Sequence, residues 1–424
     1  PAGSAEPSGW TVSVTDSSSQ RLTQAGAVGL WAYNSGSSAA NTLAADNFSA
    51  TEVLTTSEPT PEPTPEPTPT STPVSAPARG SVPVGSAQYA VPAGAVFVSV
   101  SGGSDSGSGS ESSPLRTVAA AVSRAVSGQT IVLRAGTYHE EIYIPKSKSD
   151  VTIQAYPGEA VWFDGSRAVT NWSRSGSRWV STGWTAEFDH SSSFAYGRDD
   201  SRFINSSYPM AAYPDQVFID GQPLRQVASA SQVTAGTFAV DYAANTLTIG
   251  SDPSGRSVRA SDLQQAFKIA SPGTELRGFG VRRYATPIPA MGAVLVGNPG
   301  VVLSDLVVTD NATIGVSVIR EDAVLERVTV TRSGMMGIHA NYADRLVIKD
   351  SVVTGNNSER FNHVPAAAGV KVTRTRGLTV RNSEVSHNHA NGLWADESVY
   401  DMVFVGNTMV GNDQAGIEVE ISAK

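Results

Sequence analysis

The chain has 424 residues, of which 16% are charged, and its formal net charge is −9. It contains no cysteine, which excludes disulfides, thiolate metal sites and a cysteine nucleophile. The mildly acidic balance argues against a nucleic-acid-binding surface, and no apolar run approaches the roughly 18 residues that a membrane-spanning helix needs. We therefore expect neither a nucleic acid nor a membrane as a partner.

Residues 1–53 contain short strand patterns. Apolar and polar residues alternate in GWTVSVT and in AVGLWAY, and this period of two is typical of β-strands. The stretch AGAVGLWAYNSGSSAANTLAADNFSA resembles the closing strands of a concanavalin-like jelly roll, a common carbohydrate-binding or accessory module. Since a whole sandwich needs about 100 residues, the resemblance implies the C-terminal part of a module truncated upstream.

Residues 54–87 form a spacer rich in proline and threonine, with the run EPTPEPTPEPTPTSTP. Such a segment cannot form a packed core and is expected to be an extended, semi-rigid polyproline linker. Proline-threonine spacers are typical of secreted enzymes that degrade polysaccharides. This composition predicts an extracellular, multidomain protein.

Residues 88–424 begin with the pattern of a capped solenoid. Apolar residues recur at helical spacing from Leu115 to Val126, the helical pattern stops at Gly128, and strand patterns follow. This stretch closely resembles the N-terminal cap of pectate-lyase-like β-helix proteins. The resemblance implies that a short helix covers the open end of a right-handed parallel β-helix.

The pattern changes between residues 166 and 270. Three tryptophans appear, and QVFIDGQPLRQV and GTFAVDYAANTLTIG then follow as strand-turn-strand segments. The sequence therefore predicts a β-rich insert in the solenoid. Similar inserts occur in glycosidase-like members of the β-helix group.

A repeat after Met291 carries the fold prediction. Strands of the form Gly-apolar-x-apolar-x recur at spacings of 23, 22, 32, 23 and 24 residues, and they begin at Gly292, Gly315, Gly337, Gly369, Gly392 and Gly416. A period in the low twenties with two or three short strands per turn predicts an all-β fold, a right-handed parallel β-helix. The chain stops inside a strand pattern at Ala423 and Lys424, so we expect its C-terminus to be truncated.

Two further features follow from the repeat. Asparagines fall in one column after the second strand of each coil and predict a stacked ladder at a tight turn, formed by Asn311, Asn356, Asn388 and Asn412. The spacing of 32 contains an insertion, NNSERFNHVPA, which must bulge from the coil. Because such loops often line a binding face, Glu359, Arg360 and His363 are second-rank candidates for substrate binding.

Strand alternation predicts which side chains face outward. Leu393 and Ala395 should point into the coil, whereas Trp394 and Asp396 should point out. The same rule applied to the neighbouring coils predicts an outer face with His339, Asn341, Lys371, Thr373, Trp394, Asp396, Glu418 and Glu420. A merely solvated face would favour Thr, Ser, Lys and Asn, so we interpret this face as a substrate-binding groove.

Asp396 and Glu420 occupy one column of adjacent coils. Neighbouring parallel strands lie about 4.8 Å apart, and carboxyl groups about 5–5.5 Å apart are the geometry of a retaining glycosidase. Close like charges would also raise the pKa of one member, which would supply a protonated acid and an ionised nucleophile. Trp394 could stack on a sugar ring.

The same residues carry a more specific resemblance. GLWADES, followed by GIEVEIS one coil later, resembles the retaining β-helix glycosidases of the β-xylosidase type. In that family an Asp in a Gly-apolar-Trp-x-Asp strand is the nucleophile, and a Glu one coil later is the acid/base. The resemblance implies that Asp396 is the nucleophile and Glu420 the acid/base, acting on a polysaccharide or oligosaccharide.

Other functions remain open at this stage. Asp396, Glu418 and Glu420 could be solvated carboxylates, or they could bind Ca²⁺ through oxygen ligands. Lys371 could then be the base of a calcium-dependent polysaccharide lyase or uronate epimerase. A non-catalytic polysaccharide-binding or adhesin module is a third alternative. The hydrolase interpretation needs no cofactor or metal, and we expect a monomer.

Overall fold

The computed structural model describes residues 12–14 and 79–422. The jelly-roll and linker predictions for residues 1–78 therefore lie outside the described residues, apart from one short strand, β1 (Val12–Val14). In the described part, no helix is long and apolar enough to cross a membrane.

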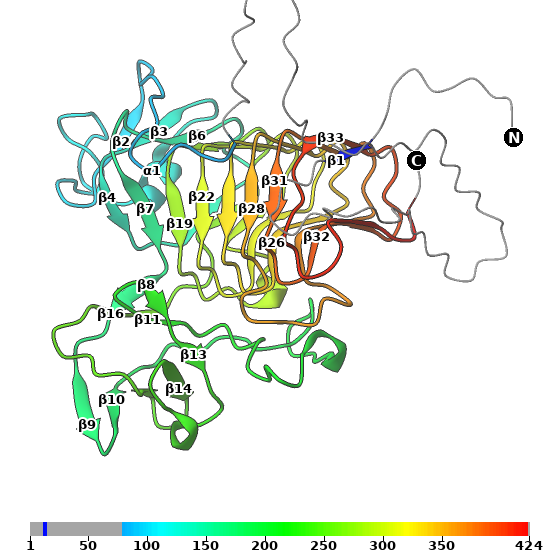
Figure 1. Ribbon diagram of the computed structural model, residues 1–424. Helices are drawn as coiled ribbons and strands as arrows, with labels where there is room; N and C mark the ends of the chain where they lie inside the picture. Colours follow the sequence, from blue (N-terminus) through cyan, green and yellow to red (C-terminus); the bar gives the residue numbers. More distant parts are fainter. Residues whose placement is uncertain (1–11, 15–78, 423–424) are drawn as a thin grey trace, which may run out of the picture.

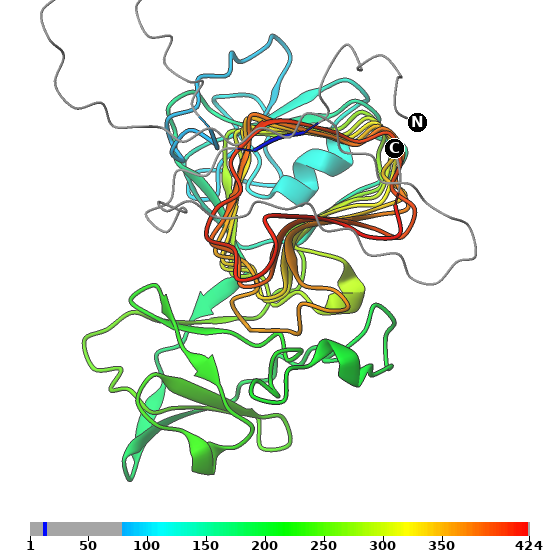
Figure 2. The same cartoon turned by 45° about the vertical axis from the view of Figure 1, so that its right-hand side comes forward.

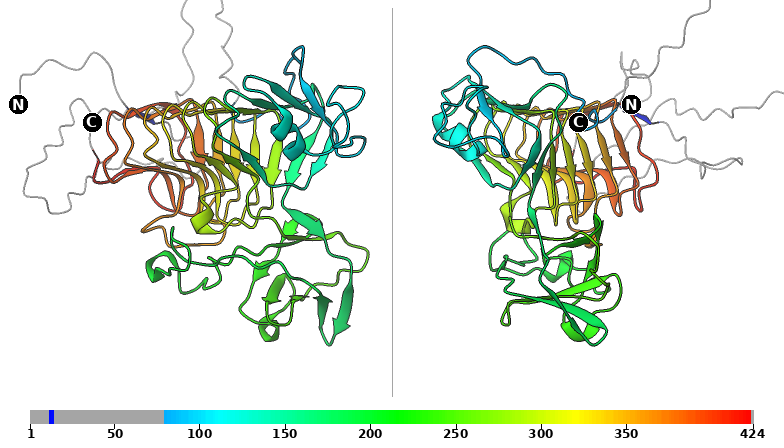
Figure 3. Two further views of the ribbon diagram at one scale, coloured as in Figure 1. Left: turned by 180° about the vertical axis from the view of Figure 1, so that it is seen from behind. Right: turned by 90° about the vertical axis from the view of Figure 1, so that its left-hand side faces the viewer.

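Three parallel sheets wind around one axis and form the β-helix (Figures 1 and 3). The first sheet contains β1, β2 (Val96–Val98), β3 (Thr130–Leu133), β6 (Thr152–Ala155), β18 (Glu275–Arg277), β21 (Val302–Ser304), β24 (Val324–Glu326), β27 (Val347–Lys349), β30 (Thr379–Arg381) and β33 (Val403–Asn407). The second contains β5 (Ile142–Ile144), β17 (Phe267–Ile269), β20 (Val294–Val296), β23 (Ile314–Val318), β26 (Met336–Asn341), β29 (Ala368–Thr373), β32 (Asn391–Asp396) and β34 (Ile417–Val419). The third contains β4 (Gly136–Tyr138), β7 (Val161–Asp164), β19 (Gly280–Arg282), β22 (Val307–Thr309), β25 (Thr329–Thr331), β28 (Val352–Thr354) and β31 (Glu384–Ser386).

Stacked aliphatic side chains fill the interior of the coils. Ile338, Val370 and Leu393 follow one another on β26, β29 and β32, and all three are fully buried in the core. Each strand therefore places alternate residues inside, as the period of two predicts. The prediction of an all-β, right-handed parallel β-helix is confirmed.

The helix α1 (Val118–Arg124) covers the N-terminal end of this core (Figure 2). It begins later than the sequence pattern predicts, because Leu115 pairs with Val98 of β2 in a β-bridge. Thr117 is the N-cap, and its side-chain oxygen accepts a hydrogen bond from Ala120 N at 3.1 Å. The apolar spacing thus indicated the buried face of the helix, but tertiary pairing set where the helix begins.

An asparagine ladder joins the C-terminal coils. Asn356 Nδ2 donates to Asn388 Oδ1 at 2.9 Å, and Asn388 Nδ2 donates to Asn412 Oδ1 at 2.9 Å. In the preceding coil, Ser333 occupies the position equivalent to Asn356, and its backbone N donates to Asn356 Oδ1 at 3.0 Å. Asn311 is therefore separated from the other three, and the predicted ladder is one coil shorter than expected.

We expect Asn388→Ala to lower the free energy of unfolding by about 2–4 kcal/mol, because it leaves the buried backbone N–H of Asn356 unpaired and removes the shortest hydrogen bond of the Asn356 side-chain amide. Urea unfolding followed by circular dichroism measures the change. Asn298→Ala is the matched control, since the Asn298 side chain makes no hydrogen bond within residues 79–422. Equal effects of the two substitutions would contradict a stabilising ladder.

Residues 166–261 form a lobe beside the β-helix (Figures 1 and 2). One sheet contains β9 (Trp172–Ser175), β10 (Arg178–Thr182), β13 (Arg225–Gln226), β14 (Thr237–Asp241) and β15 (Thr246–Ile249), and the other contains β8 (Ser166–Ala168), β11 (Val217–Ile219), β12 (Gln222–Pro223) and β16 (Val258–Ser261). Three short 3₁₀ helices complete the described elements, namely η1 (Ser201–Phe203), η2 (Ala230–Gln232) and η3 (Ile288–Ala290). The lobe has its own apolar core, which includes Trp184, Phe238 and Leu247.

The lobe is attached to the loop that interrupts the coil repeat. Asn362 N donates to Phe203 O at 2.9 Å, and Asn362 Nδ2 donates to Arg202 O at 2.8 Å. Phe203 and Phe361 pack in one apolar cluster with residues from the turns of the β-helix. The lobe and this loop therefore lie together against one side of the solenoid.

Candidate active site

Register along the second sheet assembles the candidate residues. His339, Lys371, Trp394 and Glu418 are successive partners on β26, β29, β32 and β34. Two residues further along the same strands, Asn341, Thr373 and Asp396 form a second column on this face. Thr373 Oγ1 donates to Asn341 Oδ1 at 3.0 Å. Glu418 accepts a hydrogen bond from Asn391 Nδ2.

Glu420 follows β34 and lies next to Asp396. Its backbone N donates to Ala395 O at 2.8 Å, which continues the ladder between the last two coils. Partial burial raises the pKa of Glu420, and the negative charges of Asp396 and Glu418 raise it further. The positive charge of Lys371 and the indole of Trp394 oppose this shift. Glu420 therefore stays protonated to a higher pH than an isolated glutamate.

Lys371 holds the centre of this face together. Its Nζ lies 3.0 Å from Asp396 Oδ2, 3.3 Å from the centroid of the Trp394 ring, and donates to Pro365 O at 2.5 Å. Burial lowers the pKa of Lys371, while the charge and hydrogen bond of Asp396 oppose the decrease. The ammonium thus contacts a carboxylate, an aromatic ring and a backbone carbonyl at once.

Trp394 is enclosed rather than open. Only 2% of the residue is exposed, and Lys371 covers one face of its ring. Its Nε1 makes no hydrogen bond within residues 79–422. The indole nevertheless lies near enough to the Glu420 carboxyl to lower the pKa of that group. In this arrangement the ring contacts Lys371 and presents no free face to a sugar.

The insert closes over the neighbouring coil. Phe194 stacks on His339 with ring centroids 5.4 Å apart, and His339 Nδ1 shares a hydrogen bond of 2.7 Å with Ser317 Oγ. His339, Lys371 and Asp396 are all less than 10% exposed. The face is therefore less open than strand alternation suggests, because segments distant in the sequence pack on it.

Burial of His339 has a consequence for stability. Burial, together with the positive charge of Lys371, lowers the pKa of His339 to about 4, so the imidazole is neutral at pH 7. The ordinary pKa of a histidine side chain is 6.5, so between pH 6.5 and 4 this histidine binds a proton in the unfolded chain but not in the folded chain. The free energy of unfolding should therefore fall by about 3 kcal/mol as the pH falls through this window.

We expect His339→Gln to remove most of this acid dependence. The measurement is the urea midpoint at pH 7 and at pH 4.5 for both proteins. His387→Gln, which changes an exposed histidine, is the control. Identical acid sensitivity of the wild type and His339→Gln would contradict the assignment.

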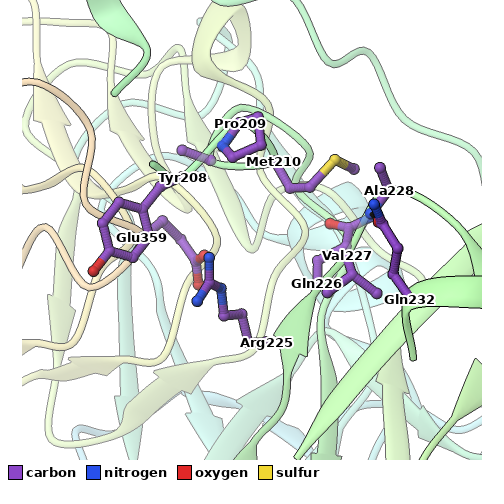
Figure 4. Close-up of a pocket in the computed structure, with 10 residues that line it drawn as sticks. Tyr208, Pro209, Met210, Arg225, Gln226, Val227, Ala228, Gln232 and Glu359 are labelled. Carbon is purple, nitrogen blue, oxygen red and sulfur yellow. Dashed lines mark hydrogen bonds between the residues drawn. The ribbon is translucent and has the colours of Figure 1, made fainter. Parts of the chain in front are cut away.

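The loop candidates lie in a different part of the surface. Arg360 and His363 line a cavity of about 210 Å³ that also includes Tyr208 and Asp413. Arg360 Nη1 lies 3.1 Å from Asp413 Oδ2. Glu359 instead lines a separate cavity of about 400 Å³ beside the insert (Figure 4). Neither cavity includes Asp396 or Glu420 in its lining.

Two residues of the site could not be found from the sequence. Phe194 contacts His339 and Pro365 contacts Lys371, but no motif or spacing singled them out. Ser317, which also contacts His339, lies in the same column one coil earlier, so the repeat could have identified it. Within residues 12–14 and 79–422, no three His, Cys, Asp or Glu side chains gather in a group that could hold a metal ion.

Two families match parts of the sequence. The family described as right handed beta helix region matches residues 292–424, and a family described as a protein of unknown function (DUF1565) matches residues 101–144. No curated protein matches the chain.

Solved structures share the architecture. The complex structure of XylC with xylose has a TM-score of 0.61 and 18% identity, and the match covers 77% of this chain and 64% of that one. A glycoside hydrolase (TM-score 0.42, 12% identity, 78% and 97% coverage) and pectate lyase Pel9A (0.38, 13%, 78% and 76%) are also similar. The chain thus spans less than two thirds of the length of XylC, and the likeness shows that the two share a fold.

Proposed function

We propose that the chain is a carbohydrate-active enzyme, a retaining glycoside hydrolase that cleaves a polysaccharide or oligosaccharide with Asp396 and Glu420. The observation that supports this most is their position on adjacent coils of one outward face, where neighbouring strands lie about 4.8 Å apart. That separation suits a nucleophile and an acid/base acting on the same anomeric carbon. XylC, solved with xylose, has the same fold.

The reaction follows in two steps. The protonated Glu420 donates its proton to the glycosidic oxygen while Asp396 attacks the anomeric carbon, so the leaving sugar departs as an alcohol and a glycosyl ester forms on Asp396. The ionised Glu420 then takes a proton from water, and the resulting hydroxide displaces Asp396 and restores both carboxyl groups. The raised pKa of Glu420 favours the first step.

Lys371 positions the nucleophile in this proposal. Its ammonium lies 3.0 Å from Asp396 Oδ2 and is itself held by Pro365 O. The pair fixes the carboxylate at the end of β32 and provides the opposite charge that a buried carboxylate needs. Asp396 Oδ1 accepts no hydrogen bond within residues 79–422 and is the oxygen that attacks the substrate in this proposal.

We expect Glu420→Gln to lower kcat by about 10²–10⁴-fold on xylo-oligosaccharides, because it removes the proton donor for a poor leaving group. Aryl glycosides with acidic phenol leaving groups should lose less in the glycosylation step. Azide should restore turnover and give a glycosyl azide that retains the anomeric configuration, which nuclear magnetic resonance identifies. Asp401→Asn, which changes an exposed carboxylate, is the control, and an equal loss in both variants would contradict the role of Glu420.

A polysaccharide lyase is the second candidate. The lowered pKa of Lys371 favours it, since a less basic ammonium more readily becomes the base that abstracts a proton beside a uronate carboxyl. A lyase would release unsaturated uronates that absorb ultraviolet light, and chelation of Ca²⁺ would stop it. Reducing sugar released without ultraviolet absorbance would support the hydrolase instead.

We also propose that the protein acts outside the cell and as a monomer. The proline-threonine spacer is the compositional reason for the first point. Culture-medium fractionation and sedimentation of the purified protein test the two statements. A polysaccharide-binding module without catalysis would retain affinity for the sugar and release no product.

A further inference from the structure

A cavity of about 400 Å³ lies between the insert and the loop that interrupts the coil repeat (Figure 4). Tyr208, Arg225 and Gln226 from the insert and Glu359 from the loop line it. Its volume is within the range of small-molecule sites, about 300–1,000 Å³. The cavity is separate from the candidate catalytic carboxylates.

One buried polar atom in this cavity lacks a partner. Gln226 on β13 is 8% exposed, and its Oε1 accepts no hydrogen bond within the described residues. Its Nε2 makes only a long contact of 3.5 Å with Asp215 Oδ2. An unpaired buried acceptor costs about 1–3 kcal/mol, and Oε1 itself is enclosed, so a ligand would recover this cost if the Gln226 amide turned toward the cavity and accepted its hydrogen bond.

Arg225 and Glu359 add further hydrogen-bonding capacity. Their side chains point toward one another in Figure 4, but they form no ion pair within 4.0 Å. Arg225 donates to Ser207 O at 3.3 Å, and its guanidinium lies 5.0 Å from the centroid of the Tyr208 ring. The Glu359 carboxyl makes no hydrogen bond within residues 79–422, and burial raises its pKa to about 7.

The backbone that carries Glu359 is nevertheless held in place. Its backbone N donates to Gly334 O at 3.0 Å, which fixes the start of the loop on the β-helix. The loop is tied to the insert by three hydrogen bonds of Asn362, to Phe203 O, Arg202 O and Ile204 O. The cavity walls are therefore connected on both sides, so the free polar groups keep their relative positions without a ligand.

These groups define the chemistry of an occupant. Gln226 Oε1 and the Glu359 carboxyl need donors, whereas the free N–H groups of Arg225 need acceptors. A hydroxyl group is both donor and acceptor, and vicinal hydroxyls of a sugar match planar amide, carboxyl and guanidinium groups. The opposite charges of Arg225 and an ionised Glu359 leave no net charge that would select an ionic ligand.

We infer that this cavity binds one neutral sugar unit of the substrate chain, at a second site apart from the carboxylate pair. The ligand class rests on the proposed function, but the cavity chemistry does not. A second contact on the same chain would raise affinity for long substrates through effective concentration and would leave short substrates unaffected.

The test measures affinity without turnover. Isothermal titration calorimetry of the Asp396→Asn chain with xylohexaose, cellohexaose and mannohexaose should show binding of at least one neutral probe. Gln226→Leu and Glu359→Leu, each added to Asp396→Asn, should weaken that binding about tenfold or more. Gln264→Leu is the matched control, because Gln264 lines a separate cavity of about 420 Å³.

Stability separates binding from folding. Gln226→Leu removes an unpaired buried oxygen, so its melting temperature should be no lower than that of its parent while its affinity falls. Undiminished affinity in both leucine variants, no binding of any neutral probe, or tighter binding of trigalacturonic acid would overturn the inference.

The outcome is distinguishable from that of the hydrolase proposal. Calorimetry needs no catalysis, so a loss of affinity in Gln226→Leu would stand even if Glu420→Gln left activity unchanged. Conversely, loss of activity in Glu420→Gln with unaltered affinity in the cavity variants would overturn the second site alone.

Discussion

Asp396→Asn should lower kcat of the retaining hydrolase proposed above by about 10⁴-fold or more, on any oligosaccharide that it cleaves, while the fold persists, because the variant cannot form the covalent glycosyl ester. The substitution replaces a carboxylate with a neutral amide of the same shape, so the neighbouring coils should stay in place. Initial rates of reducing-sugar release measure the loss, and circular dichroism tests the fold. The loss should be similar for substrates with good and poor leaving groups.

Azide gives this prediction a second readout. Asp396→Gly leaves room for azide at the anomeric carbon, so the product should be a glycosyl azide of inverted configuration. Asp401→Asn, which changes an exposed carboxylate, is the control and should keep full activity. Wild-type turnover by Asp396→Asn would end the assignment of the nucleophile.

Lys371→Met should lower the free energy of unfolding by about 3–5 kcal/mol, because it leaves Asp396 as a buried carboxylate without its ammonium. Met preserves much of the side-chain volume and the contact with the Trp394 ring. The loss should therefore reflect charge rather than packing. Urea unfolding at pH 7 measures it.

A double substitution separates the two contributions. In Lys371→Met/Asp396→Asn no charge is left unpaired, and most of the lost stability should return. Lys268→Met is the matched control, because Lys268 lies in the same column of the sheet on β17 but is exposed. If the double variant were as unstable as Lys371→Met alone, the ion pair would not explain the effect.

The coil repeat was predictable because each coil repeats the same local requirement. Gly-apolar-x-apolar-x places alternate residues in the interior, and Leu393 and Ala395 are indeed fully buried. The register that brings Asp396 beside Glu420 follows from the near-constant coil length. The asparagine ladder followed for the same reason, except where Ser333 replaces asparagine.

The surroundings of the site were not predictable from any periodic pattern. Phe194 stacks on His339, and Pro365 O accepts a hydrogen bond from Lys371. Neither Phe194 nor Pro365 occupies a position of the coil repeat. The cavity of Gln226 and Glu359 likewise joins β13 of the insert to a loop of the solenoid. The Phe194 contact and the cavity depend on how the insert packs against the β-helix, and the Pro365 contact depends on the fold of the interrupting loop; the spacing of the repeat encodes none of them.

The amino-acid sequence by itself determined the period of the coils and whether each strand residue points to the interior or to the outer face. It therefore also determined the column of candidate carboxylates. The tertiary structure alone decided which of those outward residues are covered, which partner each charge has, and where cavities remain. The physical reason is range: side-chain alternation is a property of neighbouring residues along one strand. Burial and ion pairing depend on side chains from different coils, from the loop that interrupts the repeat and from the insert, which come together only in the folded protein.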